Sequence, residues 1–153
     1  MDTGLRPIEL SKLEARDVVV KGDRPSVTTW ETKTDDPRTV PLTRRAAAIV
    51  RERLVAAGPT DKLFPERYGQ LRLRWDQVRQ HMKLHTDPQF VIYCLRHTCA
   101  SRLTQRGVPL QVIKEWMGHK NISQTLEYAH LAPANLYNAV AALEPQQMEE
   151  AAE

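Results

Sequence analysis

The 153-residue sequence has few cysteines, no long apolar run and no signal peptide. Its two cysteines, Cys94 and Cys99, are too few for a disulfide framework and lack the spacing of a metal site, so we interpret them as reduced thiols packed as small hydrophobic side chains. No apolar run approaches the roughly 18 residues that cross a bilayer. The N-terminus lacks the basic and then apolar segments of a signal peptide, and we therefore expect a cytoplasmic protein without a membrane partner.

Metal-ligating patterns are also sparse. His81 and His85 are four residues apart, a spacing that can bind a metal on one helix face. Neither a third ligand nor an HExxH pattern accompanies them, so we expect no metal site.

Acidic residues are outnumbered by basic ones once the C-terminal segment is set aside. The chain has 22 Lys and Arg against 19 Asp and Glu, and four of these acids lie in residues 144–153, which hold no Lys or Arg. The rest of the chain therefore has 22 basic residues against 15 acidic ones, a net charge of +7. A basic body favours a polyanionic partner. The acidic segment itself is typical of a disordered tail.

The first third of the chain predicts a short helix and then a small sheet. Residues 3–18 read as the helix, with Arg6 and Pro7 at its start, where proline is tolerated. This start is so close to Met1 that we expect preceding sequence to be missing. Three β-rich runs follow, separated by Gly, Pro and Asp turns, and they predict an antiparallel meander: VVVK, SVTTWETK and RTVPL. Lys33 falls at or near a hairpin tip.

The remainder has helical periodicity. Thr43 is the expected N-cap of one helix, which Gly58 and Pro59 end. Apolar residues at helical spacing predict a second helix over 71–82. The basic residues beside this stripe are either a solvated face or phosphate contacts: Arg72, Arg79 and Lys83.

Shorter helices follow. Apolar residues at 95, 99 and 103 predict one helix, for which Gly107 is the stop signal. The next helix is expected from Pro109 to Gly118. Asn121 and Gln124 resemble a capping box, which predicts a helix that contains Tyr128. A last helix is expected from Pro133 to Leu143, with an apolar stripe that needs a partner surface in its own domain or in a neighbouring subunit.

Three side chains in this helical region stand out by chemistry. Arg96 lies near the start of its helix, His119 follows a helix-ending glycine, and Tyr128 comes nine residues later. Arginine presents a planar cationic fork to phosphate oxygens, and tyrosine is an oxygen nucleophile that needs activation. Histidine can move a proton or donate to an oxyanion. If tight turns bring these residues together, they suit phosphoryl transfer.

The motifs that contain these residues resemble the tyrosine recombinases, or phage-type integrases. The resemblance extends from about residue 3 to residue 143 and rests on five segments in the family's order: TGLRPIEL, TKTDDPRTVPL, LRHTCASRL, GVPLQVIKEWMGH and TLEYAHL. It implies an α+β fold, mainly α-helical with a small three-stranded antiparallel sheet, in which residues 1–143 form a catalytic domain lacking its own first helices. The family needs neither a metal nor another cofactor.

The resemblance also implies roles for individual residues. Arg6 and Arg96 correspond to the two catalytic arginines that grip the scissile phosphate. Lys33 corresponds to the hairpin lysine that protonates the departing 5′ oxygen. His119 corresponds to the histidine beside the phosphate, and Tyr128 to the nucleophile that forms a 3′-phosphotyrosine link.

One position departs from the family pattern. Tyr93 stands where the family usually has a histidine, so it is either an active-site hydrogen-bond donor or a core aromatic, and the identity of the general base stays open. His97 and His130, next to or near the expected catalytic residues, are interpreted as structural supports. Tyr68 and Tyr137 are rival nucleophiles by residue type alone.

The sequence therefore predicts a site-specific DNA recombinase or integrase. The implied partners are double-stranded DNA and further copies of the protein, which would form a tetramer on DNA. Two alternatives stay open: a type IB topoisomerase-like enzyme that nicks and reseals, and a non-catalytic DNA-binding relative.

Overall fold

The computed structural model describes residues 1–30, 37–133 and 143, and it contains the predicted meander. Strands β1 (Val18–Val19), β2 (Ser26–Trp30) and β3 (Pro37–Pro41) form one antiparallel sheet in the order β1-β2-β3. Val27 of β2 pairs with Val40 of β3, and Thr29 pairs with Arg38. Because side chains alternate along a strand, these four residues lie on one face of the sheet.

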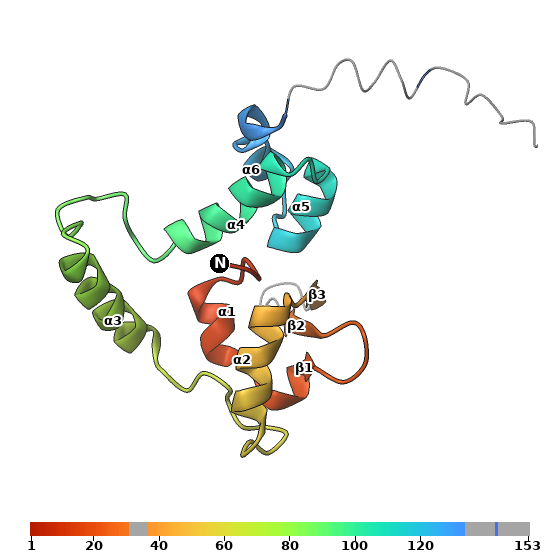
Figure 1. Ribbon diagram of the computed structural model, residues 1–153, viewed down its shortest axis with the longest axis vertical. Coiled ribbons are helices and arrows are strands. Elements are labelled where there is room, and N and C mark those ends of the chain that lie inside the picture. Colours follow the sequence, from red (N-terminus) through yellow and green to blue (C-terminus); the bar gives the residue numbers. More distant parts are fainter. Residues whose placement is uncertain (31–36, 134–142, 144–153) are drawn as a thin grey trace, which may run out of the picture.

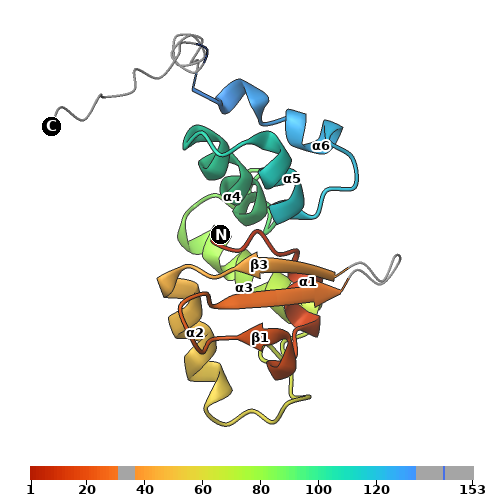
Figure 2. The same cartoon turned by 90° about the vertical axis from the view of Figure 1, so that its right-hand side faces the viewer.

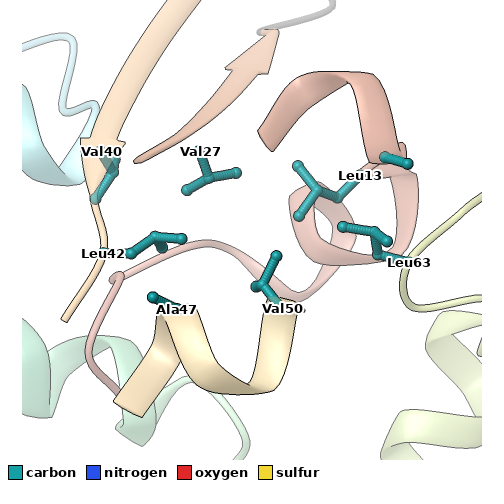
Figure 3. Packing of buried hydrophobic residues seen from close by; sticks show 8 residues of the cluster. Leu13, Val27, Val40, Leu42, Ala47, Val50 and Leu63 are labelled. Carbon is teal, nitrogen blue, oxygen red and sulfur yellow. The ribbon is translucent and has the colours of Figure 1, made fainter. Parts of the chain in front are cut away.

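That face covers the first hydrophobic core. Helix α2 (Arg44–Leu54) packs its Ala47 and Val50 beneath the buried Val27 and Val40, as Figure 3 shows. Each fully buried valine of this kind contributes roughly 1.5–3 kcal/mol to the hydrophobic driving force. The predicted N-cap is confirmed, because the Thr43 hydroxyl accepts a 3.2 Å hydrogen bond from the amide of Ala46.

The N-terminal helix is shorter than predicted. Helix α1 (Pro7–Lys12) begins at the expected proline but stops at Leu13, whose backbone is extended. The Leu13 carbonyl accepts a hydrogen bond from Leu63, and Leu13 joins the core. Tertiary pairing thus ends the helix, and a 3₁₀ turn, η1 (Ala15–Asp17), follows.

The C-terminal helices form a second core. It contains Cys99 and Ala100 of α4 (Cys94–Gln105), Ile113 and Met117 of α5 (Leu110–Met117), and Tyr128. Gly107 and Gly118 adopt positive φ angles at the ends of these two helices, as predicted. Figures 1 and 2 show these helices at one end of the molecule, the sheet with α1 and α2 at the other, and the N-terminal residues between them.

The predicted helix around Tyr128 is wrong in its extent. Helix α6 covers only Ser123–Leu126, and Tyr128 lies in the turn before a 3₁₀ helix, η2 (Ala129–Leu131). The Asn121 side chain accepts a bond from Ser123 rather than completing a capping box with Gln124. The short helix ends where Tyr128 turns inward to the second core.

Helix α3 (Tyr68–His81) is present where its periodicity indicated, but its apolar stripe is not buried. Trp75 packs on Phe90 with ring centroids 4.9 Å apart, while two other members of the stripe, Val78 and Met82, are 42% and 51% exposed. Figure 1 shows α3 at the periphery, beyond α1, with which it is in contact.

Several predictions fall on residues outside the described ranges. Lys33 lies within residues 31–36, and the last helix and the acidic tail fall largely within 134–142 and 144–153. Among the described residues, no helix is both long and apolar enough to cross a membrane.

Candidate active site

Two arginines from distant parts of the sequence meet at the C-terminal end of α5. Arg96 donates hydrogen bonds to the carbonyls of Gly4 and Met117, and Arg6 Nη2 donates to the carbonyl of Gly118 at 3.1 Å. The last carbonyls of a helix have no partner within the helix and carry partial negative charge. The end of α5 therefore places Arg6 and Arg96 side by side, immediately before His119.

Two glycines permit this convergence. Gly118 has φ +62°, and a Cβ there would lie 1.9 Å from Arg38 Nη1. Gly4 also has φ +62°, and a Cβ there would lie 2.7 Å from Met117 Sδ. Both positions need the left-handed backbone and the small volume that glycine provides.

A third arginine joins the cluster through a shared carboxylate. Glu9 accepts from Arg6 Nη1 at 2.7 Å and from Arg38 Nη2 at 3.1 Å, and also from the amide of Arg6. Burial acts to raise the pKa of Glu9, but the hydrogen bond from the Arg6 amide and the charges of Arg38 and Arg6 outweigh it, so this pKa lies below its ordinary value. One ionised carboxylate thus serves two guanidinium groups, and with Arg96 the cluster keeps an excess of positive charge.

Arg96 is the most deeply placed member of the cluster. It is 6% exposed, and burial together with the charge of Arg6 lowers its pKa to about 10. Arg96 therefore stays cationic at neutral pH and presents only a small edge to solvent. Arg6 has the more accessible side chain, with a quarter of its surface exposed.

His119 faces this positive charge. Its Nδ1 lies 2.9 Å from Oγ1 of Thr125, which is fully buried. Burial, followed by the charges of Arg96, Arg6 and Arg38, lowers the pKa of His119 to about 4. The imidazole is therefore neutral near pH 7. In the tautomer whose Nδ1 accepts from the threonine hydroxyl, the proton lies on Nε2, which can donate to an anion.

Tyr128 lies at the same end of the molecule and is 8% exposed. Its hydroxyl lies 2.6 Å from Nδ1 of His97, a residue in the first turns of α4. Burial and the neighbouring Glu127 raise the pKa of Tyr128, while Arg96 acts in the opposite direction. The phenol is therefore protonated at neutral pH and needs a proton acceptor before it can act as a nucleophile.

The structure brings four of the six predicted site residues together: Arg6, Arg96, His119 and Tyr128. Tyr93 is the N-terminal boundary residue of α4, is 38% exposed, and its hydroxyl forms no hydrogen bond with any described residue. It is thus not a core aromatic. Lys33 lies outside the described residues.

Four residues of the site were not assigned to it from sequence: Glu9, Arg38, Thr125 and His97. A signal was present for Arg38, because strand alternation places it on the same face as the buried Val40. Glu9 also follows Arg6 at the i, i+3 spacing of a helical ion pair. The contacts of Thr125 and His97 join segments whose proximity depends on the tertiary fold.

A hollow of about 730 Å³ opens beside the cluster. Its lining includes Arg38, Lys114, His119 and Lys120, together with Glu9 and Glu115. In the part of the chain that the structure describes, no group of three or more His, Cys, Asp or Glu residues is arranged to hold a metal ion. Cationic groups, a neutral histidine donor and a tyrosine hydroxyl suit binding of a phosphate and attack upon it.

Comparison with known proteins agrees with this chemistry. Residues 1–135 match the model of the phage integrase family. A probable integrase/recombinase from Methanocaldococcus jannaschii is 30% identical over 142 residues. The match covers 84% of this chain and 42% of the length of that relative. The integrase of Escherichia phage P2 is 28% identical and covers 92% of this chain and 38% of its own. The chain thus spans less than half the length of these relatives.

Solved structures give the same result for the fold. The catalytic domain of bacteriophage HP1 integrase has a TM-score of 0.71 and 26% identity, covering 99% of this chain and 80% of that one. The recombinase XerH bound to its difH substrate has a TM-score of 0.67 and 20% identity, covering 94% and 44%. The mainly helical α+β architecture with a three-stranded sheet is therefore that of a known catalytic domain.

Proposed function

Because this chain belongs to the phage integrase family, we propose that it is the catalytic part of a site-specific DNA recombinase that cleaves and rejoins strands. The observation that carries this proposal is the convergence of Arg6 and Arg96 on the adjacent carbonyls of Gly118 and Met117, directly before His119. An anion-binding cluster of this kind beside a tyrosine is what cleavage through a covalent protein–DNA link requires.

The arginines act on the phosphate. Each guanidinium has five N–H donors, and the bonds to backbone carbonyls and Glu9 use only some of them. The remaining donors would neutralise the non-bridging oxygens as negative charge builds on the crowded phosphorus. Since the carbonyls of α5 already fix both side chains, little reorganisation is needed in the transition state.

Tyr128 acts as the nucleophile. Its oxygen attacks phosphorus, a 3′-phosphotyrosine bond forms, and the bond from phosphorus to the 5′ oxygen breaks. Neutral His119 donates its Nε2 proton in a hydrogen bond to a phosphate oxygen, and Lys33 supplies the proton that the 5′ oxygen takes up. Rejoining reverses these steps, so the phosphodiester bond is conserved without a cofactor.

Double-stranded DNA is the proposed partner. The solved structure of XerH contains its difH substrate, and that of the Tn1549 transposon integrase contains circular intermediate DNA. The net charge of +7 outside the acidic tail, together with Arg38, Lys114 and Lys120 around the hollow beside His119, favours contact with phosphates. Assembly of the protein into a tetramer on DNA is part of the same proposal.

Recombination is preferred over topoisomerase-like nicking and resealing because the similar proteins carry the names integrase and tyrosine recombinase. A non-catalytic role is not favoured, since four of the expected catalytic side chains occupy one cluster. Strand exchange between two DNA sites distinguishes a recombinase from a topoisomerase.

Covalent trapping tests the proposal. A pool of nicked duplexes with a randomised central sequence is incubated with the full-length protein, and the duplex most enriched in covalent adducts becomes the trapping duplex. Arg6→Ala should slow adduct formation on this duplex by roughly 10²- to 10³-fold, because it removes one preorganised donor to the transition state. The affinity for DNA, measured separately, should fall far less.

Arg102→Ala is the matched control. Arg102 carries the same charge, is exposed, and lies on α4 away from the cluster. Its loss should leave the rate of adduct formation within a few-fold of wild type. If Arg6→Ala lost cleavage rate and DNA affinity equally, Arg6 would be a general phosphate anchor. If the wild-type protein formed no adduct, the proposed function would be contradicted.

A further inference from the structure

The proton of the attacking tyrosine needs an acceptor, and the chain has no histidine at the position where its family usually has one. Tyr93 stands there instead, and a tyrosine is a poor base near neutral pH. The hydroxyl of Tyr128 nevertheless has a basic partner elsewhere. Nδ1 of His97 lies 2.6 Å from it, within the range of a short hydrogen bond.

We propose that His97 is the general base of strand cleavage, accepting the proton of Tyr128 as its oxygen attacks phosphorus. This inference rests on the proposed function, since it takes Tyr128 as the nucleophile. It gives a catalytic step to a histidine that, by sequence alone, reads as a structural support.

Geometry favours His97 because it reaches the reacting oxygen from a fixed position. It lies in the first turns of α4, the helix that also carries Arg96, and α4 packs against η2, the 3₁₀ helix that follows Tyr128. The rings of His97 and Tyr128 have centroids 6.1 Å apart and are inclined by 37°, so they meet through the nitrogen and oxygen rather than by stacking. One helix would thus hold both the phosphate ligand Arg96 and the base.

Exposure of His97 also suits the role. Tyr128 is buried, whereas His97 is exposed to solvent. A proton received on Nδ1 can therefore leave to water through the other ring nitrogen. A buried base would have to hold that charge beside Arg96.

The other basic groups of the site are poorly suited to this step. Nδ1 of His119 is engaged by Thr125. Burial, and then the charges of three arginines, lower the pKa of His119 to about 4, which makes it a weak base. Glu9 is engaged by Arg6 and Arg38. Burial also raises the pKa of Tyr128, so the phenol does not ionise unaided at neutral pH.

The step is balanced in protons and bonds. A neutral His97 with its hydrogen on Nε2 presents a lone pair on Nδ1 to the Tyr128 hydroxyl. The bond from the tyrosine oxygen to phosphorus forms, the tyrosine proton moves to His97 Nδ1, and the bond from phosphorus to the 5′ oxygen breaks. That oxygen takes a proton from Lys33, the proposed acid. In rejoining, His97 returns a proton to the tyrosine oxygen.

The test measures single-turnover adduct formation by the full-length protein on the trapping duplex. His97→Ala should slow cleavage by roughly 10²- to 10⁴-fold, the usual contribution of a general base, with unchanged affinity for the duplex. His97→Asn keeps a hydrogen-bond acceptor near the hydroxyl but cannot take up the proton, and it should be as slow as His97→Ala. Added imidazole should restore part of the rate of His97→Ala. A duplex with sulfur in place of the bridging 5′ oxygen bypasses the acid and should rescue Lys33→Ala but not His97→Ala.

His130→Ala is the matched control, because His130 is an exposed histidine two residues from Tyr128 without a role in this step. It should cleave at the wild-type rate. A wild-type rate of cleavage by His97→Ala would overturn the inference. Full activity of His97→Asn would also overturn it, because His97 would then only orient the Tyr128 hydroxyl. These outcomes differ from failure of the proposed function, in which the wild-type protein forms no adduct or Tyr128→Phe still forms one.

Discussion

At the scale of the residue, His119 shows how the cluster sets a protonation state. Burial, and then the charges of three guanidinium groups, lower its pKa to about 4, so its imidazole is neutral at neutral pH. A phosphate in the site would offset part of this positive charge and raise the pKa of His119. The pKa of about 4 therefore describes the DNA-free site.

This protonation state predicts a dependence of stability on pH. The pKa of His119 is lower in the folded protein than the 6.5 of an ordinary histidine, so between pH 6.5 and pH 4 the unfolded chain binds more protons at this residue. The free energy of unfolding should therefore fall as the pH is lowered from 6.5 toward 4. His119→Gln should flatten this part of the profile, measured by urea denaturation. An unchanged slope between pH 6.5 and pH 5, above the range where carboxylates titrate, would contradict the assigned environment of His119.

At the scale of the element, the end of α5 organises the site. Its last carbonyls hold Arg6 and Arg96, its terminal glycine allows Arg38 to approach, and the next residue is His119. A single helix terminus thus connects α1, β3 and α4. Any change that moves this turn should affect stability and cleavage together.

Gly118→Ala tests this dependence, and Gly22→Ala is its control. Both glycines have positive φ, but a Cβ at Gly22 would meet nothing within 4 Å, whereas at Gly118 it would collide with Arg38. Gly22→Ala should cost only the backbone strain of roughly 1–2 kcal/mol, and Gly118→Ala should cost more. Thermal unfolding and adduct formation on the trapping duplex measure both effects. Equal destabilisation with normal cleavage in the two variants would show that the approach of Arg38 does not matter.

The elements could largely be predicted from sequence because their signals are local. Thr43 as an N-cap and Gly107 and Gly118 as helix ends act through their immediate neighbours, and the structure confirms each. Tyr128 could not be placed correctly, because its turn depends on packing against α4 rather than on local capping. The contact between His97 and Tyr128 joins residues 31 positions apart, and no periodicity of the chain encodes it.

At the scale of the whole molecule, the chain spans less than half the length of these relatives. The protein has two cores, one under the sheet and one among α4, α5 and Tyr128. The N-terminal segment, which includes Gly4 and Arg6, lies between them. The cluster of Arg6, Arg38, Arg96 and Glu9 lies at this junction. The position of Tyr128 is therefore a consequence of the fold as a whole.

The most direct measurement identifies the residue that carries DNA after cleavage. Adducts of the full-length protein with the trapping duplex are digested with nuclease and trypsin, and the peptide linked to a nucleotide is sequenced by mass spectrometry. We expect the nucleotide on Tyr128, the tyrosine beside His97 and the arginine cluster, and no adduct from Tyr128→Phe. A nucleotide on Tyr93, Tyr68 or Tyr137 would contradict it.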